Sequence, residues 1–358
     1  MAKVSKQLKG RAQRLHEEAI VIDALDVSRF DDKHFRKMQQ GGITAANATV
    51  AMPIANFRQA VEAIRDFDSL IDQHKDLVTP IYSIDDISRA KAEKKIGIIY
   101  GLQNTLPIEG DLRLIKAFRS LGVRIMQLTY MTGNLIGDGC LEPRNGGLTI
   151  FGQAVVRELN RLGIVIDLSH VGENSTLEAI EISEKPVAFT HACARAIVDH
   201  PRNKTDKVIR ALAEKGGVMG ITGYADFVCD YGHGETPNLD HYLSHVDYVV
   251  NLAGIDHVGI GMDFEEGHPY DFLASPAWGG SRIMAGPRPV SVWPQPKAVP
   301  DSSKIPEVTE GLLARGYPEN DIRKILGGNW LRLFSEVWEA LRAEFKAPSS
   351  KSRGRVGS

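Results

Sequence analysis

Short apolar runs rich in β-branched residues alternate along this chain with stretches of helical periodicity. Parallel strands are buried on both faces, so they read as nearly continuous apolar runs, as IVIDLSH and HVGIGMDF do here. The stretches between them, such as FRQAVEAIRDFDSLIDQH and IFGQAVVRELNRLG, place apolar residues on one helical face, and several end at a glycine. The pattern predicts repeated strand–helix units around a parallel sheet.

The number of apolar runs decides between two architectures. Eight runs favour an α/β fold of the closed (β/α)8 TIM-barrel type, and a doubly wound open sheet is the alternative because its strand ends look similar in sequence. The predicted strands are 19–23, 43–52, 96–101, 123–128, 164–168, 187–190, 217–222 and 257–262. We expect one barrel domain over 19–345, an N-terminal extension over 1–18 and a disordered basic tail over 346–358.

Two features follow the eighth predicted strand. A Pro/Gly/Trp-rich segment over 265–306 is expected to pass over the barrel mouth and shape specificity. Helical periodicity then returns, and the final helix, starting at 319, is expected to close the barrel bottom or to form an oligomer contact.

Composition excludes several classes of protein. The chain has 358 residues, is 43% hydrophobic and carries a net charge of −2, which gives no general attraction to nucleic acid or to an anionic membrane. Its three cysteines form no CxxC pattern, which argues against a disulfide framework or a structural zinc cluster. No apolar run approaches the roughly 18 residues of a membrane span, and no signal peptide is evident. We expect a cytoplasmic protein that acts on a small molecule.

Two histidines end neighbouring predicted strands. His170 follows the fifth apolar run and His191 ends the sixth, at the side of a barrel where chemistry is placed. Neutral imidazoles on adjacent strand ends can share one metal ion, which would generate a nucleophilic hydroxide near neutral pH. Hydrogen-bonded structural histidines remain the alternative interpretation.

Other polar residues gather at the same rim. Asp263 ends the eighth run, where it can bind metal, act as a general base or simply cap a loop. Gln103 and Asn134 follow the third and fourth runs and can orient a substrate, while Tyr130 can stabilise an oxyanion. Arg202, in a PRN turn, can hold a substrate carboxylate or form a surface salt bridge.

The stretch over 147–203, together with GIDHVGIGMDF and ILGGNWLRLF, resembles the membrane dipeptidase (renal dipeptidase, peptidase M19) family. The resemblance covers about 20 to 338 and implies a metallo-dependent hydrolase-like TIM barrel, often a homodimer, that cleaves dipeptides with two zinc ions. His170 and His191 match the ligands of the second zinc. Asp263 matches the aspartate that handles the proton, and Arg202 matches the arginine that binds the substrate carboxylate.

The other half of the family's site is different here. Leu25 and Val27 replace the His-x-Asp ligands, Gln103 replaces the bridging glutamate, and Tyr130 replaces a histidine that contacts the substrate. Leucine and valine cannot bind metal, and an amide is a poorer ligand than a carboxylate. Asp26 cannot substitute, because strand alternation directs it to the opposite face.

This comparison with the family predicts at most one metal site. Its ligands would be His170, His191, Asp263 and solvent or Gln103. Zinc is the expected ion, at one per chain, with manganese or no metal as alternatives.

Three functions follow from these residues. The first is a dipeptidase-like metal-dependent hydrolase that cleaves a dipeptide or related small amide bearing a free carboxylate. The second is a repurposed amidohydrolase-like lyase, isomerase or non-peptide hydrolase, with one metal or none and with Tyr130 and Asp263 as acid and base. The third is a catalytically inactive ligand-binding barrel, which retention of His170, His191, Arg202 and Asp263 makes the least favoured.

Overall fold

The computed structural model describes residues 6–268 and 297–338 and shows a closed parallel barrel. Within those residues, nine strands form one sheet in the order β2-β1-β9-β8-β7-β6-β5-β4-β3, and pairing of β2 with β4 closes an eight-stranded cylinder. The (β/α)8 prediction is confirmed, and an open doubly wound sheet is excluded. The strands are β1 Ile22–Asp26, β2 Ala45–Ala51, β3 Val78–Pro80, β4 Ile96–Leu102, β5 Val123–Gln127, β6 Val165–Asp167, β7 Ala188–Ala192, β8 Val218–Ile221 and β9 Val258–Ile260.

Strand β3 is the one described strand that the apolar pattern does not predict. It pairs with the first half of β4, where Val78 lies opposite Ile96, whereas the second half of β4 pairs with β5. Strand β3 therefore lies beside the cylinder and is not one of its eight strands. Only Val78 of its three residues is fully buried, so the segment has no apolar run.

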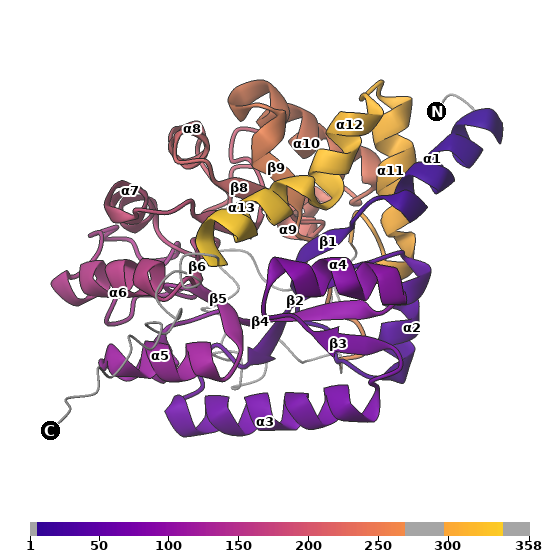
Figure 1. The fold of residues 1–358 in the computed structure, drawn as a ribbon. Coiled ribbons are helices and arrows are strands. Elements are labelled where there is room, and N and C mark those ends of the chain that lie inside the picture. The colour runs from indigo at the N-terminus through magenta and orange to yellow at the C-terminus, as the bar shows by residue number, and fades with distance from the viewer. Residues whose placement is uncertain (1–5, 269–296, 339–358) are drawn as a thin grey trace, which may run out of the picture.

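Helices surround the cylinder, as expected from the alternating pattern (Figure 1). Asn56 and Gln59 form a capping box at the start of α3, and the Thr149 hydroxyl caps α6, so local sequence fixes both starts. None of the described helices has an apolar stretch long enough to cross a bilayer. The helices are α1 Lys6–Glu18, α2 Asp32–Gln40, α3 Phe57–Gln73, α4 Ile84–Glu93, α5 Arg113–Ser120, α6 Ile150–Arg161, α7 Glu173–Ile182, α8 Asp206–Glu214, α9 Ala225–Val228, α10 Leu239–Ala253, α11 Ile305–Ala314, α12 Glu319–Arg323 and α13 Asn329–Trp338.

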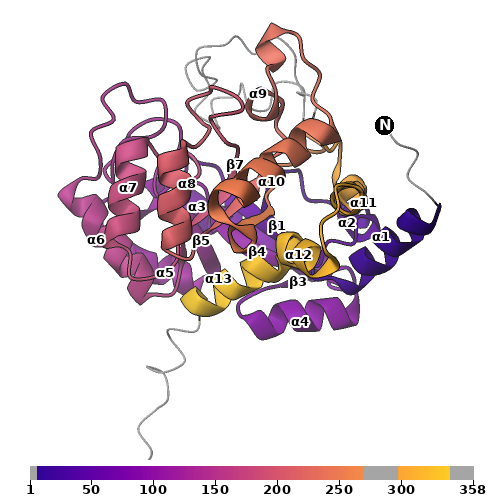
Figure 2. The same ribbon diagram turned by 90° about the horizontal axis from the view of Figure 1, so that it is seen from above.

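Helix α13 closes the bottom of the barrel, which is one of the two roles expected for the C-terminal helix. Its apolar face, including Trp330 and Phe334, packs in one cluster with residues at the starts of the strands, such as Ile22 and Val165. The Trp330 indole donates a hydrogen bond to the Ile260 carbonyl over 3.1 Å. Gly259 makes room for this ring, since a Cβ there would lie 2.3 Å from the indole nitrogen. The helix crosses the barrel end in Figures 1 and 2.

The N-terminal segment expected as an extension includes helix α1, which lies beside α11 in both views (Figures 1 and 2). Leu15 and His16 are buried in this contact, and the His16 ring bonds to the Thr309 hydroxyl over 2.7 Å. The predicted tail over 346–358, and 269–296 of the segment expected over the mouth, lie outside the described residues.

Candidate active site

The two predicted histidines meet at the carboxyl ends of β6 and β7. Their Nε2 atoms lie 2.8 Å apart, and both side chains are buried. Burial, and then the nearby charge of Arg202, lowers the pKa of both imidazoles well below the usual value. Both rings are therefore neutral, which is the form that binds metal.

A hydrogen-bond relay fixes which nitrogen of His191 carries its proton. The Thr190 hydroxyl donates to the Asp167 carboxylate over 2.6 Å, because a carboxylate can only accept. The same hydroxyl oxygen lies 2.8 Å from His191 Nδ1 and must accept from it. His191 therefore presents the bare Nε2 lone pair toward His170.

The remaining neighbours of the pair define what it can bind. Because His191 Nε2 is bare, the 2.8 Å contact is a hydrogen bond that His170 Nε2–H donates. Transfer of that proton to His170 Nδ1, which lies 3.3 Å from the Met131 sulfur, would free its Nε2 as a second ligand atom. Among the described residues, no third histidine, cysteine, aspartate or glutamate joins the pair in a metal-binding cluster, so Asp263 is not placed as a ligand. The donors present fit one ion, with its other positions left to water or substrate.

The positions of the family's first metal are occupied by an apolar cluster. Leu25 and Val27 are buried and pack with Met52 and Tyr130. Asp26 points to the other side of β1, where its carboxylate lies 2.8 Å from His34 Nε2. Burial by itself would lower the pKa of His34, but the charges and hydrogen bonds of Asp26 and Glu266 together outweigh it and raise the pKa to about 10. The structure thus agrees that Asp26 does not replace the missing ligands.

Tyr130 lies directly on the histidine pair. Its ring stacks on His170 with centroids 4.3 Å apart and 23° between the planes. Burial, together with the charge of Asp263, raises the pKa of the phenol. The hydroxyl stays protonated at neutral pH and can donate a hydrogen bond.

Arg202 is buried and does not form the surface salt bridge that was its alternative. Its guanidinium donates to the Ser169 carbonyl and, over 2.7 Å, to the His191 carbonyl, and so joins the two strands that carry the histidines. Its Nε–H is buried and has no acceptor among the described residues. Such an unpaired buried donor indicates a ligand or a water molecule.

Asp263 belongs to a charged group at the mouth that the sequence does not reveal. It has the left-handed backbone angle φ +59°, which is unusual for an aspartate and typical of functional sites. The Lys297 ammonium donates to the Asp263 carbonyl over 3.0 Å and lies 3.3 Å from the Glu265 carboxylate and 3.8 Å from the centre of the Tyr224 ring. Burial raises the pKa of Asp263, and it raises that of Glu265 to about 7.

Gln103 and Asn134 have different surroundings. The Gln103 amide donates to the Thr49 hydroxyl over 2.9 Å, at the edge of the apolar cluster. Asn134 donates to Asn104, Thr105 and the Leu128 carbonyl and accepts from the Ile136 amide. These bonds join the loop after β5 to the loop after β4 and occupy the side-chain amide, which supports a role in holding the two loops together.

Comparison with known proteins agrees with this architecture. The family model described as "Membrane dipeptidase (Peptidase family M19)" matches residues 11–272 and 286–349. The chain belongs to the membrane dipeptidase family.

The curated proteins that this chain resembles include two dipeptidases. Dipeptidase aclJ of Aspergillus oryzae is 29% identical over 76% of this chain, and dipeptidase tcpJ of Claviceps purpurea is 28% identical over 79%. The matched regions cover 60% and 61% of those proteins, so the similarity spans about three fifths of their length.

Two solved structures match nearly the whole chain. An amidohydrolase from Pseudomonas aeruginosa is 38% identical, with a TM-score of 0.86 over 91% of this chain and 99% of its own. The probable dipeptidase PvdM from the same organism is 22% identical, with a TM-score of 0.78 over 94% of this chain and 99% of its own. The second likeness concerns the fold alone.

Proposed function

We propose that this protein hydrolyses a dipeptide or a related small amide with a free carboxylate, and that it uses no more than one metal ion. The observation that carries the proposal is the convergence of the His170 and His191 Nε2 atoms, with the tautomer of His191 fixed by Thr190. Two neutral imidazoles aimed at one point form half of a metal site, and an ion bound there would polarise a carbonyl and lower the pKa of water. Leu25 and Val27 supply no second site.

The other side chains are assigned by their chemistry. The free Nε–H of Arg202, beside its two bonded nitrogens, binds the substrate carboxylate. Tyr130, stacked on His170, donates to the oxygen that gains charge as the amide is attacked. Asp263, with its raised pKa, accepts a proton from the attacking water and returns it to the departing amine.

The charge of the mouth supports an anionic substrate. Lys204 and Lys297 add to the charge of Arg202 and are balanced in part by Asp263 and Glu265. Burial, and then the charge of Arg202, lowers the pKa of Lys204 to about 7. The same cations oppose a divalent ion, so we expect the single ion to be bound less tightly than in a site rich in carboxylates.

A second candidate is a metal-free hydrolase or lyase for a non-peptide amide. It is favoured by Lys297, whose buried ammonium brings a fixed positive charge to the mouth without a metal. The inactive barrel is disfavoured, because the buried Nε–H of Arg202 has no acceptor among the described residues, which is costly unless a ligand or water binds there.

The test is metal content and turnover on the same preparation. Elemental mass spectrometry should find about one zinc or manganese per chain, lost in a His170→Ala, His191→Ala variant and retained in His233→Ala, which alters an exposed histidine. A panel of dipeptides and N-acyl amino acids should be cleaved, and chelation should abolish the cleavage. Undiminished cleavage after removal of all metal would support the second candidate, and no cleavage of any panel member would overturn the proposal.

A further inference from the structure

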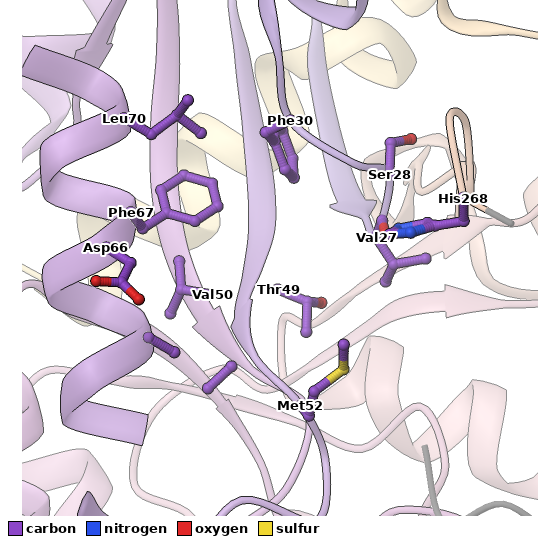
Figure 3. Close-up of a pocket in the computed structure, with 12 residues that line it drawn as sticks. Val27, Ser28, Phe30, Thr49, Val50, Met52, Asp66, Phe67, Leu70 and His268 are labelled. Atoms are coloured by element: carbon purple, nitrogen blue, oxygen red, sulfur yellow. The ribbon is translucent and has the colours of Figure 1, made fainter. Parts of the chain in front are cut away.

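A cavity of about 450 Å³ opens between the end of β2, helix α3 and the loop after β1 (Figure 3). Phe67 and Leu70 project into it from α3, and Phe30 faces them from the β1 loop (Figure 3). Val27 and Met52 form the part nearest the barrel mouth. This size is ordinary for a small-molecule pocket.

The wall of the cavity shares residues with the cluster beside the candidate active site. Val27 and Met52 line it and also belong to the apolar cluster with Tyr130, whose ring stacks on His170. Thr49 lines it as well and accepts the hydrogen bond of Gln103. One wall of the cavity therefore includes Val27 and lies one hydrogen bond from Gln103, at two positions where the resemblance implies metal ligands.

The walls select for apolar groups. Phe30 and Phe67 meet edge to face with centroids 5.1 Å apart, and they form a stiff aromatic wall. The polar side chains of the lining bond to the protein itself. Ser28 accepts a hydrogen bond from the Glu266 amide, and His268 Nε2 lies 2.7 Å from the Val27 carbonyl. The carboxylate of Asp66 is 69% exposed and pairs with Arg65 at the rim.

We propose that this cavity binds a bulky apolar group, aryl or branched alkyl, on the acyl side of the scissile amide. The inference rests on the proposed function, in which Arg202 holds the carboxylate at the other end of the substrate. The reacting carbonyl then lies at the histidine pair, between an anion-binding end and an apolar end. The substrate class is an amide of glycine or another small amino acid, acylated by a large uncharged apolar residue.

A graded substrate series tests the assignment. For Ala-Gly, Val-Gly, Leu-Gly and Phe-Gly, kcat/KM should rise about fourfold for each methylene that enters the cavity. Ala63→Leu, on the cavity-lining face of α3, should abolish the gradient by filling the space. Ser69→Leu makes a substitution of the same kind at an exposed position of α3 and should preserve the gradient.

A binding measurement separates this proposal from the proposed function. Calorimetry with N-acetyl, N-butyryl and N-phenylacetyl glycine should show affinity rising with acyl size in wild type and in Ser69→Leu, but not in Ala63→Leu. If no dipeptide is cleaved yet this pattern holds, the hydrolase proposal fails and the cavity assignment stands. If dipeptides are cleaved with no gradient in either measurement, or if Ala63→Leu keeps the gradient, the cavity assignment is wrong. Circular dichroism of both variants controls for folding.

Discussion

The two sides of the barrel mouth have opposite character. At the ends of β6 and β7, hydrogen bonds run from His191 through the Thr190 hydroxyl to the Asp167 carboxylate, each with a defined donor and acceptor. Arg202 joins the two strands. At the end of β1, Leu25 and Val27 form an apolar cluster. The backbone of the barrel does not depend on which side chains its strand ends carry, so one half of a site can change its chemistry while the other half keeps it.

The largest effect should come from breaking the polar side. His170→Ala or His191→Ala removes one of two converging donors, and we expect kcat/KM to fall on the order of 10³-fold. Steady-state kinetics with the best panel substrate measures it. Leu25→Ala, a truncation on the apolar side, is the matched control, and an equal loss there would show that the two sides do not differ in function.

Rebuilding the family's ligands on the apolar side tests the comparison in the other direction. The triple variant Leu25→His, Val27→Asp, Gln103→Glu should take up a second zinc ion per chain. Without metal, it should lose about 3–5 kcal/mol of unfolding free energy, because it buries charge that has no partner. Urea denaturation with and without zinc measures this. A stable variant with no extra metal would show that geometry, and not ligand identity, excludes the first ion.

Removing the relay behind His191 should have a smaller effect. Thr190→Val leaves the Nδ1 proton without an acceptor, and we expect metal affinity to fall about 10–100-fold. Thr190→Ser should restore it, since serine keeps the hydroxyl. Competitive metal titration against a zinc dye gives the affinities. Equal binding by the valine and serine variants would mean that the relay does not set the tautomer.

The smallest effect concerns pH. Burial raises the pKa of Glu265 to about 7, so the folded protein holds a proton that the unfolded chain has lost above about pH 4.5. The contribution of Glu265 to the free energy of unfolding therefore falls as pH rises from about 4.5 to about 7. Glu265→Gln should remove this decline and flatten any few-fold activity change near pH 7. Thermal melts and kinetics from pH 5 to 8 would test it, and an unchanged profile would contradict the assignment.

The sequence predicts most of the fold and the polar half of the site, for identifiable reasons. His170 and His191 follow apolar strands, so alternation along the chain and the edge rule for parallel barrels bring them together. Alternation also places Asp26 away from the mouth, where it meets His34. Strand β3 gives no signal, because two of its three residues are partly exposed.

Tertiary contacts determine what the sequence could not predict. Lys297 lies in a segment without periodicity and reaches the mouth through a backbone bridge to Tyr224. The PRN turn left a surface salt bridge open as the alternative role of Arg202, but the side chain runs inward to two carbonyls, which the sequence could not show. Asn134 is predicted to face the rim, and its bonds to Asn104 and Thr105, about 30 residues earlier in the chain, could not be read from the sequence.

The floor formed by α13 determines when this molecule can finish folding. During synthesis, all eight strands of the cylinder are complete once residue 260 has been made. Trp330 and Phe334, which fill the lower end of the cylinder, are made some 70 residues later. Until then, the starts of the strands surround an apolar opening. The nascent barrel therefore exposes apolar side chains at its lower end, and helix α13 is the element that excludes water from them.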